Sequence, residues 1–201
     1  MKHNPWKIVE MFEENVAEYC DSPYAVALDS CTNALLLCCQ YLNVESVTIP
    51  AHTYLSVPQA IINAGGTLKF KDCEWKGVYQ LEPYPIFDAA KRFTSDMYIP
   101  GTYMCLSFHH KKILKIGKGG VILTDDIKAV EWMKKARYEG RDHVRDNINI
   151  CGWNAYMTPE EAARGLILLQ TLPKINEDQG EIPPYRDLRT MPLFEGAVTV
   201  K

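Results

Sequence analysis

Short apolar runs alternate with longer helical patterns in the first third of the chain, and this alternation limits the fold more than any other feature. The run YAVALDS ends at Asp29 and Ser30 and is followed by CTNALLLCCQYL, an apolar stretch with the length of a buried helix. The strand-like SVTIP precedes HTYLSVPQAIINAGG, which predicts a helix closed by Gly65 and Gly66, and TLKFKD follows as a third strand. Strands separated by helices form βαβ units. The sequence therefore predicts an α/β fold, a three-layer αβα sandwich with a mostly parallel sheet.

Three more strands are predicted further along the chain. PIFDAA predicts a strand that ends at Asp88, YMCLSF one that ends near Ser107, and VILTDD a third. Residues 73–85 combine aromatic residues with Gly and Pro and have no period, so we predict a loop there.

Helices are expected at the start of the chain and after the last strand. The first 20 residues are amphipathic, and IKAVEWMKKARYEG ends at a glycine. TPEEAARGLILLQTL opens with Thr158, Pro159 and Glu161, the residues of a capping box. The residues that follow are Pro-rich and patternless. We therefore expect one large domain over residues 1–172 and a C-terminal tail over residues 173–201.

The composition excludes several functional classes. The 201 residues include 25 acidic and 22 basic side chains, and the net charge of −3 argues against a nucleic-acid partner. Seven cysteines without a C-x-x-C pair indicate reduced thiols in a cytoplasmic protein, not a disulfide framework or a zinc site. The sequence lacks both an apolar run that spans a bilayer and the hydrophobic region of a signal peptide, so we expect neither a membrane partner nor a targeting segment.

Polar residues at two predicted strand ends are candidates for chemistry. The sequence Asp29-Ser30-Cys31-Thr32 stands at a helix N-terminus, where backbone N–H groups and a hydroxyl bind an anion such as phosphate. The alternative there is an ordinary N-cap. Asp88 follows an apolar strand, where an ionised carboxylate needs a cationic partner. A simple salt bridge to Arg92 or Lys91 would also meet that need.

A basic run, HHKKILK, follows the strand that ends near Ser107 and leads into G-K-G-G. Such a run is often a solvated loop. A lysine held in a glycine-bounded turn can instead act as an imine-forming nucleophile, if burial or nearby cations lower its pKa.

Five blocks, read in order, resemble the motifs of one family. DSCTNALLL resembles an S-G-T-x-A-L phosphate turn, VTIPAHTYLSVPQAIINAGG a V-x-x-P-x-x-T-(aromatic) segment, and IFDAAKRF an E-D-A-A-(Gln or His) strand end. CLSFHHKKILKIGKGGVILTDD is similar to an S-F-x-x-x-K…G-E-G-G block, and CGWNAYMTPEEAARGLILLQ to a G-Y-N-Y-R-M…Q segment. Together they resemble the DegT/DnrJ/EryC1/StrS family of pyridoxal-phosphate-dependent sugar aminotransferases, which have the aspartate aminotransferase (type I) fold, over about residues 25–170.

The resemblance assigns roles to particular residues. Lys112 matches the lysine that forms the internal aldimine with pyridoxal 5′-phosphate, and Asp88 the carboxylate that pairs with the protonated pyridine nitrogen. The family's cofactor-binding positions fall on Cys31, Thr32, Tyr54, Asp88, Lys91, Ser107, Lys112 and Asn154. Among these, Cys31, Thr32 and Ser107 are expected at the phosphate and Tyr54 on the ring, although a core aromatic is the alternative for Tyr54. Asn154 matches a residue that reaches the neighbouring subunit, which implies a homodimer with shared sites.

The reaction implied by the resemblance is a ping-pong transamination. Glutamate supplies the amino group, Lys112 moves a proton between Cα and C4′, and a keto group on a nucleotide-linked sugar receives the nitrogen. Two alternatives stay open. One is a degenerate cofactor-binding or assembly protein, and the other is a sugar dehydratase that uses the aminated cofactor, generally with histidine at the lysine position.

Four substitutions depart from the family's pattern. Lys91 replaces Gln or His, and its amine would repel the pyridinium, pair with the phosphate or point away. Cys31 replaces a glycine, so the turn must avoid a positive φ there or bear strain. Tyr156 replaces Arg or Lys, and Lys118 replaces Glu, with no consequence that the sequence reveals.

The chain is also shorter than the family's pattern. Fifteen residues separate Asp72 from Asp88, where members usually insert strands and a helix. The usual small C-terminal domain is largely absent from the 201 residues. The expected large domain over residues 1–172 is therefore a shortened form, and its substrate pocket is expected to be open to water, which favours hydrolysis or inactivity.

Overall fold

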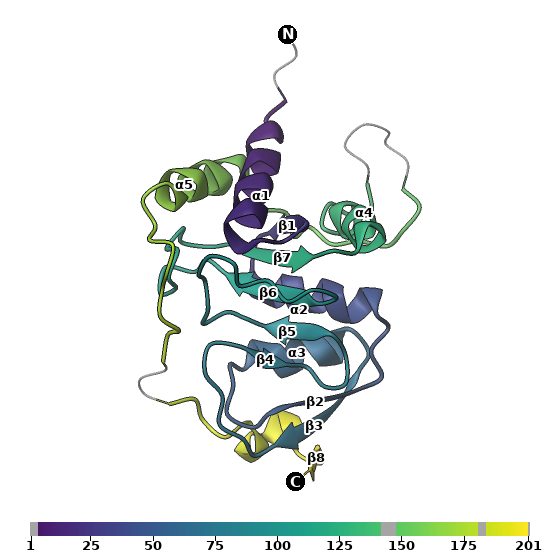
Figure 1. The fold of residues 1–201 in the computed structure, drawn as a ribbon. Helices are drawn as coiled ribbons and strands as arrows, with labels where there is room; N and C mark the ends of the chain where they lie inside the picture. The colour runs from purple at the N-terminus through teal and green to yellow at the C-terminus, as the bar shows by residue number, and fades with distance from the viewer. Residues whose placement is uncertain (1–3, 142–147, 181–183, 201) are drawn as a thin grey trace.

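The computed structural model describes residues 4–141, 148–180 and 184–200, and its centre is a set of stacked strands (Figure 1). One sheet has the order β1-β7-β6-β5-β4 and a second the order β2-β3-β8. The strands are β1 (Tyr24–Leu28), β2 (Ser46–Pro50), β3 (Thr67–Lys71), β4 (Tyr79–Gln80), β5 (Ile86–Asp88), β6 (Tyr103–Ser107), β7 (Gly120–Thr124) and β8 (Val198–Val200).

Two backbone hydrogen bonds join the sheets into one surface. Thr48 in β2 and Glu82, just beyond β4, exchange N–H···O bonds of 2.8 and 3.0 Å in an antiparallel bridge. Following the pairings from strand to strand, β4 and β7 oppose the others, so six of the eight described strands run in one direction. The predicted α/β fold with a mostly parallel sheet is confirmed.

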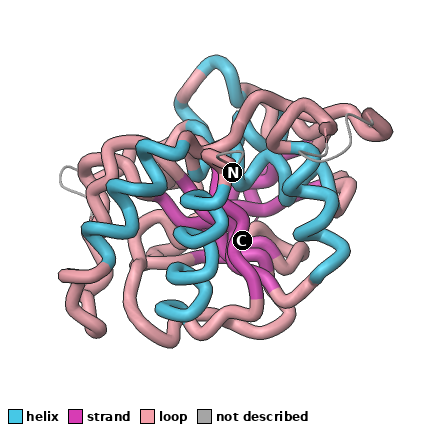
Figure 2. Tube along the Cα trace, turned by 90° about the horizontal axis from the view of Figure 1, so that it is seen from above, coloured by secondary structure: helices cyan, strands magenta, loops and turns pink. Residues whose placement is uncertain are grey.

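Helices cover both faces of this sheet, as the view from above shows (Figure 2). Alternate strand residues face opposite sides: Val26 and Ile122 pack on one cluster of buried side chains, Ala27 and Leu123 on the other. The first cluster includes residues of α2 (Cys31–Tyr41), α3 (Ser56–Asn63) and α4 (Ile127–Ala136), and the second includes residues of α1 (Lys7–Cys20) and α5 (Pro159–Leu169). This is the three-layer arrangement expected from the sequence.

Where the sequence contains a capping motif, the helix begins at that motif, as α5 shows. The Thr158 hydroxyl accepts the Glu161 N–H, the Glu161 carboxylate accepts the Thr158 N–H, and Pro159 is the first residue of α5. The prediction for α3 was wrong at its start, which is Ser56 and not His52. The His52 carbonyl instead accepts the Trp75 indole N–H at 2.9 Å, which holds the preceding turn outside the helix.

Residues predicted as a loop contain β4. Tyr79 and Gln80 pair antiparallel with Asp88 and Phe87, and the segment then bridges to β2. Two residues are too few to show alternation in a sequence, so the loop prediction for 73–85 missed a strand that occupies the middle of the sheet.

The C-terminal residues are more ordered than their composition indicates. Two short 3-10 helices, η1 (Leu188–Thr190) and η2 (Pro192–Phe194), each bury one apolar residue, Leu188 and Phe194. The Phe194 ring meets Phe70 of β3 edge to face at 5.9 Å, and β8 then pairs parallel with β3. Within the described ranges, no helix has the length and apolar character needed to cross a membrane.

A buried ion pair ties α1 to α4 across β1. Glu13 and Arg137 are 3% and 4% exposed, and Arg137 Nη1 donates to both Glu13 Oε1 and the Ala27 carbonyl. Glu13 Oε1 also accepts the Ala27 N–H at 2.9 Å, and Glu13 Oε2 lies 3.0 Å from Lys134 Nζ. Burial raises the pKa of the Glu13 carboxyl, but the charges of Arg137 and Lys134, together with the hydrogen bonds from Ala27 and Arg137, outweigh burial and leave this pKa below its ordinary value.

Replacing Glu13 with Gln would leave the buried Arg137 charge without its partner. We expect the free energy of unfolding to fall by about 3–5 kcal/mol, measured by urea denaturation at neutral pH. Glu14→Gln, on the exposed side of the same helix, is the matched control and should change it by less than about 0.5 kcal/mol. Equal effects of the two substitutions would contradict this role of Glu13.

The ion pair also predicts how stability depends on pH. Because the folded pKa of Glu13 is lowered, its contribution is complete above the unfolded value of about 4.3 and is lost as the pH falls through the folded value. Acid unfolding curves of the wild type and Glu13→Gln should therefore converge at low pH.

Candidate active site

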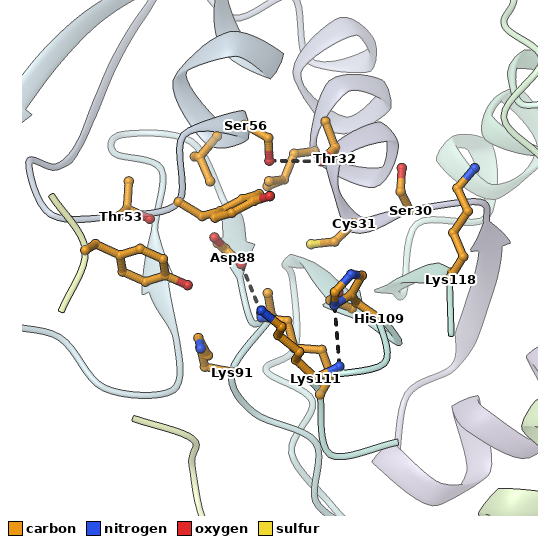
Figure 3. Close-up of a pocket in the computed structure, with 18 of the residues that line it drawn as sticks. Ser30, Cys31, Thr32, Thr53, Ser56, Asp88, Lys91, His109, Lys111 and Lys118 are labelled. Atoms are coloured by element: carbon orange, nitrogen blue, oxygen red, sulfur yellow. Dashed lines mark hydrogen bonds between the residues drawn. The ribbon is translucent and has the colours of Figure 1, made fainter. Parts of the chain in front are cut away.

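A cavity of about 280 Å³ lies where β5 and β6 end and α2 begins. Seven of the eight predicted cofactor-binding residues line it: Cys31, Thr32, Tyr54, Asp88, Lys91, Ser107 and Lys112. Thr32 and Ser56 lie on one side of the cavity, Lys91 and Lys111 on the other, and Asp88 between them (Figure 3). Polar groups from distant parts of the chain thus converge on one space, as expected at the carboxyl ends of parallel strands.

The first turn of α2 forms one end of the cavity. Ser30 is the N-cap and its hydroxyl accepts the Asn33 N–H at 3.2 Å, while the Thr32 hydroxyl donates to Ser56 Oγ at 2.9 Å. The amides of Cys31 and Thr32 precede the first helical hydrogen bond, so they lie at the positive end of the helix dipole. Cys31 has helical backbone geometry, and the strain considered for it does not arise.

Close backbone contact holds this turn against β7. A Cβ atom on Gly120 would lie 2.4 Å from the carbonyl carbon of Ser30 and 2.5 Å from the amide nitrogen of Cys31. Only glycine allows that approach. Gly120 therefore fixes the distance between the sheet and the N-terminus of α2.

Asp88 is the buried carboxylate of the site, with 5% of its surface exposed. Oδ1 accepts the Ala90 N–H at 2.9 Å and Oδ2 accepts the Tyr79 hydroxyl at 2.8 Å. Burial raises the pKa of the Asp88 carboxyl above its ordinary value, although these two bonds and the charges of Lys112 and Lys91 act in the opposite direction. The carboxylate is held firmly and would gain from a cation brought into the cavity.

Ser107, the last residue of β6, and Lys112, in the turn that follows, both line the cavity. The Lys112 N–H donates to the His109 carbonyl at 2.8 Å, which closes the turn, and the side chains of both lysines 111 and 112 line the cavity. Burial, with His110 and the two lysines, lowers the pKa of the His109 imidazole, so this ring is neutral at pH 7. The basic run is therefore not simply a solvated loop.

Tyr54 is not a core aromatic. It precedes α3, its side chain borders the cavity, and the residue is 54% exposed. Its ring meets that of Tyr185 edge to face at 6.2 Å. The core alternative considered for Tyr54 is thus excluded.

Asn154 lies apart from the residues that line the cavity. It is exposed, and its amide Nδ2 donates to Glu139 Oε1 at 3.3 Å. An exposed position agrees with a contact to a neighbouring subunit, but nothing in a single chain tests that contact. The expected role of Asn154 stays a prediction.

The structure decides several alternatives left by the sequence. Arg92 does not pair with Asp88, because its guanidinium forms a two-bond contact (2.8 and 2.6 Å) with Asp178. Lys118 pairs with Asp29 at 3.2 Å. Tyr156 packs edge to face on Trp6 at 5.0 Å, which accounts for an aromatic residue at that position.

Sequence reasoning missed several residues of the site. Thr53 and Ser56 border the cavity near Tyr54, and Trp75 and Tyr185 form an outer wall with nearly parallel rings, 6.2 Å apart and 13° between planes. Trp75 and Tyr185 are far apart in the sequence, and neither belongs to a motif. No local signal would have found them.

A second cavity, of about 560 Å³, adjoins the first through this wall. Both cavities are bordered by Trp75, Tyr185 and Lys91, whose Nζ lies 5.6 Å from the centre of the Tyr185 ring. Lys91 therefore lines the site. This excludes one of the three orientations considered for its amine, the one that points away. The wall separates the smaller cavity, which holds Asp88 and Lys112, from a larger space that opens beside it.

The sequence profile of the DegT/DnrJ/EryC1/StrS aminotransferase family matches residues 4–99 and 99–187. The chain belongs to this family. GDP-perosamine synthase of Caulobacter vibrioides is 26% identical over 209 aligned residues, covering 81% of this chain and 56% of that protein.

Two solved structures share the fold. S. venezuelae DesV, determined in complex with a ketimine intermediate, has a TM-score of 0.70 at 21% identity and covers 82% of this chain and 57% of that one. The putative sugar aminotransferase Spr1654 of Streptococcus pneumoniae, in its PMP form, has a TM-score of 0.68 at 18% identity, with coverages of 83% and 59%. The chain thus spans 56–59% of the length of these three relatives.

The family uses pyridoxal phosphate, and the cavity fits this cofactor at both ends. The amides of Cys31 and Thr32 and the hydroxyl of Thr32 suit a phosphate dianion. At the other end, Asp88 is a desolvated carboxylate that a protonated ring nitrogen would neutralise. The residues present are therefore compatible with the group that the family binds.

Gly120→Ala should move the first turn of α2 and weaken the phosphate end of the cavity. We expect the affinity for pyridoxal phosphate to fall about tenfold, the equivalent of roughly 1–3 kcal/mol of overpacking, by isothermal titration calorimetry. Gly180→Ala is the control, because a Cβ there meets nothing within 4 Å. An unchanged affinity in Gly120→Ala would show that this contact does not position the turn.

Proposed function

We propose that this protein binds pyridoxal 5′-phosphate and transfers an amino group from glutamate to the keto group of a nucleotide-linked sugar. The observation that carries the proposal is the convergence of a buried carboxylate, a lysine and a helix N-terminus on one cavity. Family membership supports the reaction class.

Each group in the cavity has a distinct task under this proposal. Thr32, the backbone of Cys31 and the Ser107 hydroxyl would hold the phosphate, and Tyr54 would cover the ring. Asp88 would hold a proton on the ring nitrogen. When bound, the cofactor supplies an electron sink for the negative charge left at a substrate's α-carbon.

Lys112 would carry the proton. Its amine reaches the same cavity as Asp88, at the turn that follows β6. It would take the proton from the α-carbon of glutamate and deliver it to the cofactor's C4′, and reverse these transfers for the sugar. The larger cavity beyond Trp75 and Tyr185, which Lys91 also borders, offers space for an acceptor beside the first cavity.

The first test is the absorbance spectrum of the protein with pyridoxal phosphate. We expect a band of covalently held cofactor that glutamate bleaches and a nucleotide-linked keto sugar restores. Lys112→Ala should abolish the band, because the amine that bonds the cofactor is gone. Lys115→Ala is the matched control, since Lys115 is exposed in the same basic turn and should leave the spectrum unchanged.

Two results would contradict the proposal. Absence of the band in the wild type would refute cofactor binding. A band that glutamate does not change would favour a cofactor-binding protein that does not transaminate.

We also propose a homodimer in which Asn154 reaches the phosphate of the neighbouring subunit, so that a monomer has an incomplete site. Asn154→Ala should weaken cofactor retention about tenfold in equilibrium dialysis, the effect of one hydrogen bond to a charged group. Asn149→Ala, also exposed, should have no effect. A monomer in size-exclusion chromatography that retains the cofactor tightly would refute the shared site.

A further inference from the structure

Tyr79 of β4 lies next to the carboxylate of Asp88 and is hydrogen-bonded to it. The two residues face each other in the β4–β5 pairing, and the Tyr79 hydroxyl donates to Asp88 Oδ2 at 2.8 Å. Tyr79 is 8% exposed, and its ring packs on Trp75 with 4.6 Å between centroids. The phenol therefore has a fixed place on the side of Asp88 that belongs to β4.

A second buried hydroxyl, that of Thr53, is hydrogen-bonded to the Tyr79 phenol. Thr53 Oγ1 lies 2.6 Å from the Tyr79 oxygen, and Thr53 is 2% exposed. Because the Tyr79 proton is directed to Asp88, Thr53 is the donor in this contact. Burial, with the charge of Asp88, raises the pKa of the Tyr79 hydroxyl well above its ordinary value, so the phenol keeps its proton. The Thr53 hydroxyl therefore donates to Tyr79, and the Tyr79 hydroxyl donates to Asp88.

Charged and titratable groups from other elements also face Asp88. The Cys31 thiol of α2 and the Cys105 thiol of β6 stay neutral, because burial raises the pKa of each well above its ordinary value. Lys112 and Lys91 contribute positive charge from two loops, and the Ala90 N–H binds Oδ1. The Tyr79 hydroxyl is the donor to Oδ2 from the neighbouring strand.

We propose that Tyr79, backed by Thr53, is a positioning residue that keeps Asp88 ionised and oriented, and so sets the lower pH limit at which the cavity holds a cationic ring. The inference rests on the proposed function for its ligand, pyridoxal phosphate. The arrangement follows from the short segment between Asp72 and Asp88, which brings β4 into contact with β5.

The decisive experiment follows the Asp88 carboxyl in the cofactor-free protein. Carbon NMR of aspartate-labelled protein, with Asp88→Asn to assign the signal, gives its titration directly. Tyr79→Phe should shift the Asp88 midpoint upward by about one pH unit or more, the loss of one hydrogen bond to a charged group. Tyr84→Phe is the matched control, because that hydroxyl accepts the Glu45 N–H away from the cavity. An unmoved Asp88 midpoint in Tyr79→Phe would overturn the inference.

A second measurement follows pyridoxal phosphate retention against pH. Tyr79→Phe should lose the cofactor at a higher pH on the acid side, with about tenfold weaker binding there, and should match the wild type once Asp88 is ionised. Equal weakening at every pH would indicate a structural role only and would overturn the inference.

Two further outcomes keep the tests independent. If Tyr79→Phe does not fold, Thr53→Val should shift the Asp88 midpoint in the same direction by a smaller amount, and no shift there would refute the role of Tyr79. If the wild type binds no pyridoxal phosphate, the proposed function fails, while the cofactor-free titration still decides whether Tyr79 controls Asp88.

Discussion

The buried carboxylate of Asp88 is the constraint on which the site depends. A negative charge with 5% exposure is unfavourable unless donors and cations surround it. Its neighbours meet that need from three segments: Ala90 and Lys91 just after β5, Tyr79 on β4, and Lys112 in the turn after β6. Because the carboxylate attracts positive charge into a chamber whose other end is a helix N-terminus, the cavity is polarised along its length. This polarity suits a ligand with a cationic ring and an anionic phosphate.

Sequence patterns predicted the parts of this site that are local in the chain. Ser30 caps α2 and Thr158 caps α5 because capping depends on residues three positions apart. The expected roles of Lys112 and Asp88 came from contiguous motifs at strand ends, and the folded sheet brings such ends to one edge. The family resemblance supplied the eight expected residues, and seven of them line one cavity in the structure.

The features that the sequence did not reveal depend on contacts between distant residues. Tyr185 reaches the cavity from the C-terminal segment. Arg92 pairs with Asp178, although Asp88 is much nearer to it in the sequence. The strand β4 has two residues, too few for any period to appear. The segment of β4 nevertheless bridges to β2 and so joins the two sheets, and it carries Tyr79. The unpredicted parts are thus those that depend on pairings between residues far apart in the sequence.

The Glu13–Arg137 pair lies within one hydrogen-bonded path that leads to the site. The Arg137 carbonyl accepts the Ala155 N–H at 2.9 Å, and the Ala155 carbonyl accepts the Asp29 N–H at 2.9 Å, one residue before the cap of α2. Asn154 is next to Ala155, so the same path fixes the surface proposed to meet a second subunit. Protonation of Glu13 would therefore weaken the hold on Arg137, and through these two backbone hydrogen bonds it would act on the residue next to the cap of α2.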